Sequence, residues 1–192
     1  MMTDTDYGYS VDGGLPSLIS AYDFASLCPG LSSTYEQMQA VLDAVSDAVR
    51  GYCGWHVSPS LRCDYVGHGI GDLLMLPGMN VTDVESLSIS GEQTAQFEWT
   101  GAGMVRLTSG RFPDSWRSAE CTYTAGYSSA VIAHIVAQIA SNALVAAPGV
   151  SSERAGNVSI TYNQTGAGIT GGISLLDRDR ELLARYRLAE AR

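Results

Sequence analysis

The sequence of 192 residues contains no lysine, so all eleven of its Lys and Arg positions are arginine. We interpret this absence as a compositional bias rather than as a feature of function. The chain also has only three phenylalanines, against ten tyrosines, and only 16% of its residues are charged. Because 45% are hydrophobic and the chain is long enough to bury a core, we expect a single folded domain.

Basic clusters are missing from most of the chain. The arginines are scattered until the C-terminal stretch RDRELLARYRLAEAR, and the net charge is −9. Proteins that hold nucleic acid usually carry basic clusters that displace counterions from phosphates. The composition therefore argues against nucleic-acid binding, whereas an acidic surface would repel DNA and would suit a surface that DNA must slide past.

No secretory or membrane-spanning segment is predicted. The stretch MMTDTDYGYSVDGG has no arginine and no apolar core, which is unlike a signal peptide, and we expect residues 1–14 to form a mobile arm. The apolar stretch Ala130–Ala147 is interrupted by polar residues, so it predicts a buried helix rather than a membrane span. Without a secretory signal, the four cysteines should be reduced thiols.

Helical patterns occupy the first part of the chain and the region after its centre. A first helical piece is expected at Leu15–Leu27. Ser33 and Glu36 have the spacing of a capping box, and apolar residues then recur at helical spacing as far as Tyr52. The apolar segment of about Ser129–Ala147 has a polar stripe of only a few residues. Its own domain or neighbouring copies must therefore cover it.

Short strands fill the intervening region of about 61–125. The stretch FEWTGAGMVRLTSG predicts a hairpin, and SAECTYTAG predicts a strand with Cys121, Tyr123 and Ala125 on one face. The fold class we expect is α+β, a small helical bundle with an inserted, mostly antiparallel β-sheet.

A glycine-rich loop and a last helix are expected to end the chain. The loop spans residues 163–173 and should be flexible. The helix spans about 174–190, with Asp177 as the capping-box acid three residues after Ser174.

Patterns that could carry chemistry are weak. Gly166, Gly168 and Gly171 match a dinucleotide-binding fingerprint, but no further strand follows them, so we interpret the segment as a loop. His134 lies within the apolar helix and is interpreted as part of its polar stripe. We expect no enzyme, no cofactor and no metal site. One candidate zinc set has a spacing irregular for zinc and is interpreted as structural: Cys53, His56, Cys63 and His68.

A series of local patterns carries a family resemblance. In chain order they are AVRGYCGWHVSP, LLMLPGMNVTDVESLSISG, FEWTGAGMVRL, PDSWR, TYTAGY, VSSERAGNVSITY and LLDRDRELLARYR. In this order and spacing, the chain resembles the head–tail connector (adaptor) proteins of long-tailed bacteriophages, in particular those of actinobacteriophages. The resemblance extends over roughly Ser33 to Leu188.

The resemblance implies a structural virion protein of the neck, at the head–tail interface, which is present in the host cytoplasm during assembly. Such proteins form a homo-oligomeric ring, usually of twelve copies, that binds the portal protein above and a head-closure or tail-completion protein below. DNA passes through the ring without specific binding, and no membrane is involved. The C-terminal segment docks on the portal, and its removal should leave the fold intact. The portal-binding residues would be Leu182, Arg185, Tyr186, Arg187 and Leu188.

Two alternatives stay open. The chain could be another neck component, such as a head-closure or tail-terminator protein, because its centre is rich in strands. It could also be a small zinc-binding module built on the cysteine and histidine set given above.

Overall fold

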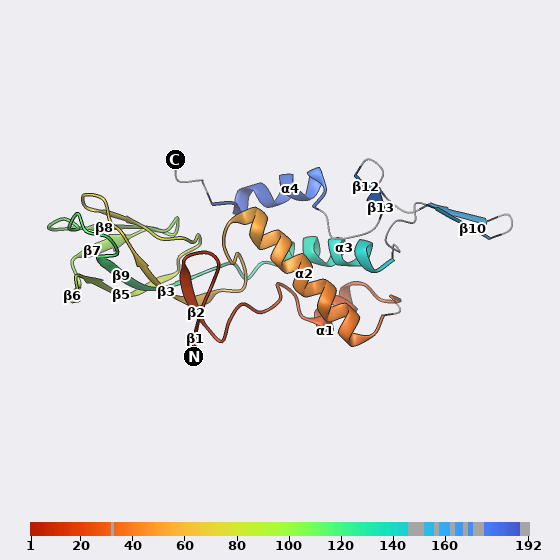
Figure 1. Ribbon diagram of the computed structural model, residues 1–192, viewed down its shortest axis with the longest axis horizontal. Coiled ribbons are helices and arrows are strands. Elements are labelled where there is room, and N and C mark those ends of the chain that lie inside the picture. Colours follow the sequence, from red (N-terminus) through yellow and green to blue (C-terminus); the bar gives the residue numbers. More distant parts are fainter. Residues whose placement is uncertain are drawn as a thin grey trace. The chain divides into compact units, whose positions relative to one another are not determined.

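The computed structural model in Figure 1 describes residues 1–31, 33–145, 152–155, 158–161, 164–166, 169–170 and 175–188. The chain forms two compact units, where a single domain was expected. The strand unit comprises Met1–Leu15, Cys53–Ser128 and Tyr186–Arg192, and the helical unit comprises Pro16–Tyr52 and Ser129–Arg185. Each unit is discontinuous in sequence, so no shift in composition marks a boundary between them. Helices and antiparallel sheets are both present, which confirms the α+β class.

The strand unit contains a six-stranded antiparallel sheet. Its two central strands pair along their whole length, from Leu61 opposite Ala125 to Gly67 opposite Ala119. Cys121, Tyr123 and Ala125 are at most 2% exposed, which confirms the face predicted from their alternation. In spatial order the strands are β1 (Met2–Asp4), β2 (Tyr9–Asp12), β3 (Leu61–Gly67), β9 (Ala119–Ala125), β5 (Asp83–Ile89) and β6 (Glu92–Thr94).

The N-terminal residues 1–14 were expected to be a mobile arm, and the structure corrects this. They form β1 and β2, and β2 pairs with β3 from Tyr9 opposite Tyr65 to Val11 opposite Cys63. Tyr9 is 3% exposed and Val11 is fully buried. A two-residue alternation inside a polar stretch is too short to predict a strand, and the neighbouring strands β1 and β3 supply the hydrogen bonds that hold it.

A second sheet of three strands completes the strand unit. Its order is β4 (Leu73–Met75), β8 (Met104–Leu107) and β7 (Phe97–Trp99), and β7 and β8 form the predicted hairpin. The turn of this hairpin requires glycine at position 103. Gly103 has a φ of +85°, and an added Cβ would lie 2.4 Å from the carbonyl oxygen of Gly78.

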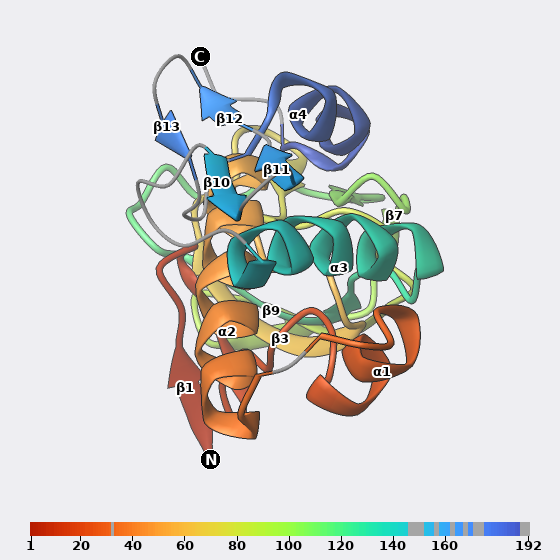
Figure 2. The ribbon, with the colours of Figure 1, turned by 90° about the vertical axis from the view of Figure 1, so that its right-hand side faces the viewer.

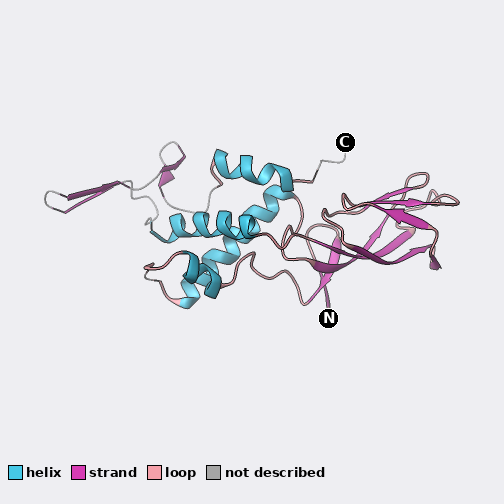
Figure 3. Ribbon diagram, turned by 180° about the vertical axis from the view of Figure 1, so that it is seen from behind, coloured by secondary structure: helices cyan, strands magenta, loops and turns pink. Residues whose placement is uncertain are grey.

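The helices of the helical unit are shown in cyan in Figure 3. The unit contains α1 (Ala21–Leu27), most of α2 (Tyr35–Cys53), α3 (Ala130–Val145) and α4 (Asp177–Leu183), and α4 continues into the 3₁₀ turn η1 (Ala184–Tyr186). Two strand pairs lie between α3 and α4: β10 (Ser152–Ala155) with β11 (Val158–Thr161), and β12 (Gln164–Gly166) with β13 (Ile169–Thr170). Among the described residues, no helix has the length and apolarity that a membrane crossing needs.

One side of the apolar helix α3 is buried within the chain. Ile132, Val136 and Ile139 are at most 4% exposed, while His134 and Gln138 are exposed. Helix α1 contacts α3, and Figure 2 shows the two helices next to each other. The end of the predicted helix at Ala146–Ala147 lies outside the described residues.

Two helix starts differ from those predicted. The capping box of α2 uses Thr34 and Gln37 instead of Ser33 and Glu36, because Thr34 N–H donates to Gln37 Oε1 and Gln37 N–H donates to Thr34 Oγ1, both at 3.2 Å. The two candidate boxes are one residue apart in sequence, so spacing alone could not separate them.

The last helix was expected to span about 174–190, with Asp177 as the capping-box acid three residues after its start, and this is corrected. It begins at Asp177, and Asp179 accepts a hydrogen bond of 3.1 Å from the backbone N–H of Leu176. Ser174 and the residues after 188 lie outside the described residues. Within the predicted loop 163–173, β12 and β13 form a short strand pair, and the other residues of the loop are not described.

Candidate partner-binding segment

The five residues predicted to bind the portal differ in their surroundings. Leu182 is 51% exposed on α4, and Arg185 is exposed in the turn that follows it. Tyr186 is only 4% exposed, Arg187 is exposed and Leu188 is half-buried. The first two belong to the helical unit and the last three to the strand unit, so the structure does not gather them on one element.

Tyr186 is buried in an aromatic cluster of the strand unit, which it forms with Trp55 and Tyr127. The indole Nε1–H of Trp55 donates a hydrogen bond of 2.6 Å to the carbonyl oxygen of Tyr186. The ring of Tyr127 lies edge-on to both neighbours, with centroid distances of 5.1 Å to Tyr186 and 5.9 Å to Trp55. Such edge-to-face pairs stabilise a fold beyond the apolar area that they bury.

The cluster continues through His56, which is fully buried. Its Nε2 lies 3.0 Å from the carbonyl oxygen of Ala125, and its Nδ1 lies 2.6 Å from the hydroxyl of Tyr9. A carbonyl can only accept, so Nε2 carries the proton of the neutral ring. Nδ1 then accepts from the Tyr9 hydroxyl, which itself accepts a hydrogen bond from the backbone N–H of His56.

Two backbone hydrogen bonds lie beside this cluster in the strand unit. Leu188 N–H donates to the carbonyl oxygen of Cys53 at 2.9 Å, and Tyr127 N–H donates to that of Val57 at 2.8 Å. Residues 186–188 are therefore held within the strand unit by the backbone hydrogen bond of Leu188, by the hydrogen bond from Trp55 to Tyr186 and by ring contacts.

Gly126 makes the close packing around His56 possible. Its φ is +121°, and an added Cβ would lie 2.3 Å from the carbonyl oxygen of Pro59 and 2.9 Å from His56 Nε2. Only glycine avoids both the strained backbone and the clash. Gly126 follows directly after β9, and its positive φ turns the backbone away from the direction of the strand.

Helix α4 is attached to the helical unit by its buried side. Leu183 is fully buried, and Asp179, the capping acid, is 2% exposed. The hydroxyl of Tyr52 donates to the carbonyl oxygen of Arg180 at 3.0 Å. These contacts hold α4 in the helical unit, while the side chain of Leu182 is half exposed.

Removing residues 182–192 was expected to leave the fold intact; because Tyr186 is buried, we now expect the deletion to destabilise the strand unit. The ring and the carbonyl oxygen of Tyr186 both complete the aromatic cluster. The resemblance grouped Tyr186 with its exposed neighbours, and helical spacing does not say which side chains a remote segment will cover. The signals that could have found the anchor are the aromatic residues within the quoted patterns GYCGWH and TAGY.

The candidate zinc residues have other contacts. Burial raises the pKa of the Cys53 thiol and of the Cys63 thiol to about 12, and metal ligation needs the thiolate. Both ring nitrogens of His56 take part in the hydrogen bonds given above, and Nδ1 of His68 lies 3.0 Å from the carbonyl oxygen of Ser115. Within the described part of the chain, no three metal-binding side chains form a group.

The glycines of the fingerprint at Gly166, Gly168 and Gly171 lie largely outside that part.

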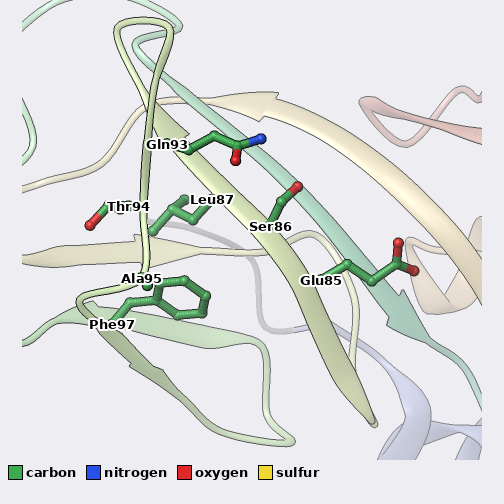
Figure 4. Close-up of a pocket in the computed structure, with 7 residues that line it drawn as sticks. All are labelled: Glu85, Ser86, Leu87, Gln93, Thr94, Ala95 and Phe97. Atoms are coloured by element: carbon green, nitrogen blue, oxygen red, sulfur yellow. The ribbon is translucent and has the colours of Figure 1, made fainter.

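An open pocket of about 370 Å³ lies beside β5 and β6 in the strand unit (Figure 4). Strand β6 pairs only with Leu87–Ile89, so the first half of β5 has no strand on that side among the described residues. The carboxylate of Glu85 accepts a hydrogen bond of 2.9 Å from Arg62 Nε. The lining offers no cysteine, histidine or lysine that could act as a nucleophile or base; it consists of Glu85, Ser86, Leu87, Gln93, Thr94, Ala95 and Phe97.

The comparisons with known proteins find the fold but no family. No protein-family model matches the sequence, and no curated protein matches it. A chain in the neck of an empty GTA particle, computed with C6 symmetry, aligns with a TM-score of 0.60 at 15% identity, over 96% of this chain and 97% of its own length. A chain in the virion of a native gene transfer agent (GTA) particle aligns with a TM-score of 0.61 at 15% identity, over the same shares.

A third structure, the neck of a native GTA particle computed with C12 symmetry, has a TM-score of 0.58 at 13% identity, over 100% of this chain and 97% of that one. At such low identities, the alignments show a shared fold. They extend over nearly the whole of both chains, so this chain has the fold of proteins that are found in the neck and virion of a gene transfer agent.

Proposed function

We propose that this chain is a structural, non-catalytic protein of the neck of a phage-like virion, where it serves as the head-to-tail connector. The observation that carries the proposal is the match of the whole fold, including both units, to chains of such necks. A match to one unit alone would be weaker, since a common sheet or helical bundle recurs in proteins of many functions.

The proposed assembly is a ring of identical copies, twelve in the virion. The C6 and C12 symmetries named for the two necks support a ring, because rotational symmetry places identical contacts around one axis. The ring binds the portal protein on one side and a head-closure or tail-completion protein on the other. DNA passes through it, and the net charge of −9 suits a conduit that does not hold DNA.

For portal binding, we propose that exposed residues of the C-terminal segment make the contact and that buried ones hold the segment in place. Leu182, Arg185 and Arg187 are the contact residues, and Tyr186 is the anchor. Apolar side chains together with arginine are typical of the strongest contacts in protein interfaces. This division of roles replaces the earlier grouping of all five residues as contacts.

Portal binding is tested with the full chain and purified portal. Leu182→Asp should weaken binding by at least about tenfold, as expected for the loss of one strong interface side chain. The matched control is Tyr22→Asp, a similar change at a residue of α1 that is 82% exposed. Wild-type binding by Leu182→Asp, or an equal loss in the control, would contradict the assignment.

The location in the neck is tested separately. Purified virions are labelled with gold-conjugated antibodies against this chain and imaged by electron microscopy. Label at the junction of head and tail is the expected result. Label along the tail or over the capsid surface, or no label on intact virions, would refute the proposed function.

A further inference from the structure

Two loops of the strand unit are fixed to each other and present exposed apolar side chains. The first connects β3 to β4 and the second connects β8 to β9. Phe112 N–H of the second donates to the carbonyl oxygen of Gly71 in the first at 2.8 Å, and His68 Nδ1 lies 3.0 Å from that of Ser115. The Phe112 ring lies so close to Gly69 that an added Cβ would be 2.2 Å from it. We call this pair of loops the tryptophan tip.

The tip exposes Trp116 and Ile70, with relative accessibilities of 84% and 78%. Tryptophan is highly buried on average, and full exposure of its ring leaves a large apolar area in water. The two loops are tied by hydrogen bonds and a buried phenylalanine, so these side chains stand on an ordered support. Ordered, exposed tryptophan is among the side chains that most often dominate a protein interface.

The tip also carries positive charge in an acidic protein. Arg111 and Arg117 are exposed in the same loop as Trp116, together with the acid Asp114, while the acid of the other loop, Asp72, is paired with Arg106 of β8 at 2.7 Å. Arg117 has a positive φ of 55°, which few residues other than glycine adopt. The tip therefore presents the indole ring of Trp116, followed in sequence by Arg117, with a second arginine, Arg111, in the same loop.

The outer face of the six-stranded sheet has the opposite charge. The strand register places Asp64 beside Thr122, Glu120 beside Ser88, and Asp83 beside Thr124, so these side chains share one face. Hydrogen bonds confirm the shared face, from Thr122 Oγ1 to Asp64 at 2.9 Å and from Ser88 Oγ to Glu120 at 3.4 Å. The same face includes these charged residues: Asp4, Arg62, Asp64, Asp83, Glu85 and Glu120.

We propose that the tryptophan tip of one copy docks on this acidic sheet face of a second copy. The two surfaces are different and complementary in charge, so the contact is head-to-tail, and repetition around an axis closes a ring. The tip and the acidic face belong to the same chain and have opposite charges. This complementarity argues that the partner on the acidic face is a second copy of this chain. This inference deepens the proposed function, because it rests on the proposed ring and names its contact.

The test is a charge exchange between two variants of the full chain. The tip variant carries Arg111→Glu and Arg117→Glu, and the face variant carries Asp83→Arg and Glu120→Arg. Each variant alone pairs like charges at every contact, so we expect its self-association to be at least about tenfold weaker than that of the wild type. In a 1:1 mixture, the acidic tip meets the basic face, and the wild-type tip meets the wild-type face. Alternating copies should then assemble.

Assembly is measured by light scattering and native mass spectrometry over a range of protein concentrations, and folding by circular dichroism. Recovery of oligomers in the mixture supports the proposal, as does weaker wild-type association at high salt. Trp116→Ser should also weaken association, while the control Met75→Ser, at a residue 54% exposed elsewhere in the strand unit, should not.

Three results would overturn the proposal: wild-type association of either variant alone, no recovery in the mixture, or a wild-type chain that stays monomeric at the highest soluble concentration. None of these affects the neck assignment, which is decided by the gold-labelled virions. Conversely, label outside the neck together with charge-exchange recovery would refute the proposed function and leave the contact between copies standing.

Discussion

The indole N–H of Trp55 donates a hydrogen bond of 2.6 Å to the carbonyl oxygen of Tyr186, which lies 131 positions later in the chain. This bond, in a buried aromatic cluster, attaches the C-terminal segment to the strand unit. The proposed portal contacts at Arg185 and Arg187 flank the anchored residue. A variant that destabilises the aromatic cluster should therefore also weaken binding of the portal.

Trp55→Phe keeps an aromatic ring but removes the donor. The buried carbonyl of Tyr186 loses its partner, and the ring is smaller, so we expect the free energy of unfolding to fall by about 2 kcal/mol. Urea unfolding followed by circular dichroism measures the change. Trp116→Phe, at the exposed tip, is the matched control and should alter stability by less than about 0.5 kcal/mol. Equal stabilities of the two variants would argue against the anchor.

Two Gly→Ala substitutions should have opposite effects. Gly126→Ala places a Cβ against a backbone carbonyl at a positive φ, and we expect a loss of at least about 2 kcal/mol or failure to fold. Gly51→Ala lies within α2, where nothing is within 4 Å of the added atom, and should stabilise by about 0.5–1 kcal/mol. Thermal unfolding of both variants is the measurement, and a stable Gly126→Ala protein would contradict the packing described here.

Stability should decrease in alkaline solution. Burial raises the pKa of three thiols, those of Cys53, Cys63 and Cys121, from 9.0 to about 12. The unfolded chain therefore releases these protons at lower pH than the folded chain. Their contribution to stability is present below about pH 9 and is lost as the pH rises toward 12. Urea midpoints at pH 8, 10 and 11 should fall in that order, whereas an unchanged midpoint would show that the thiols are not buried.

The residue that caps α2 is Thr34 in the structure and Ser33 in the prediction from sequence, and two alanine variants can tell them apart. Thr34→Ala removes the side chain that accepts from Gln37 N–H and should cost about 1 kcal/mol. Ser33→Ala removes a hydroxyl that is buried without a hydrogen-bond partner among the described residues, so it should be neutral or slightly stabilising. Equilibrium unfolding of the two variants decides between them, and the reverse order of effects would restore the cap predicted from spacing.

Strands were predicted correctly where the alternation of apolar and polar residues continued over several positions. The register of β9 against β3 and the hairpin of β7 and β8 are examples, because a period of two commits every side chain to one face. The short run at Tyr9 and Val11 lacked that length. Its strand exists because β3 offers an open edge and because His56 accepts a hydrogen bond from the Tyr9 hydroxyl.

The amino-acid sequence by itself determined the α+β class, the long amphipathic and apolar helices and the strands between them, since these depend on local periodicity. Only the tertiary structure decided the division into two units, the burial of Tyr186 beside Trp55 and the exposure of Trp116 on its tip. All three depend on contacts between segments far apart in sequence. Such contacts do not produce a regular spacing of residues in the sequence. The fold sets which distant residues meet, whereas a helix or a strand repeats at a fixed period.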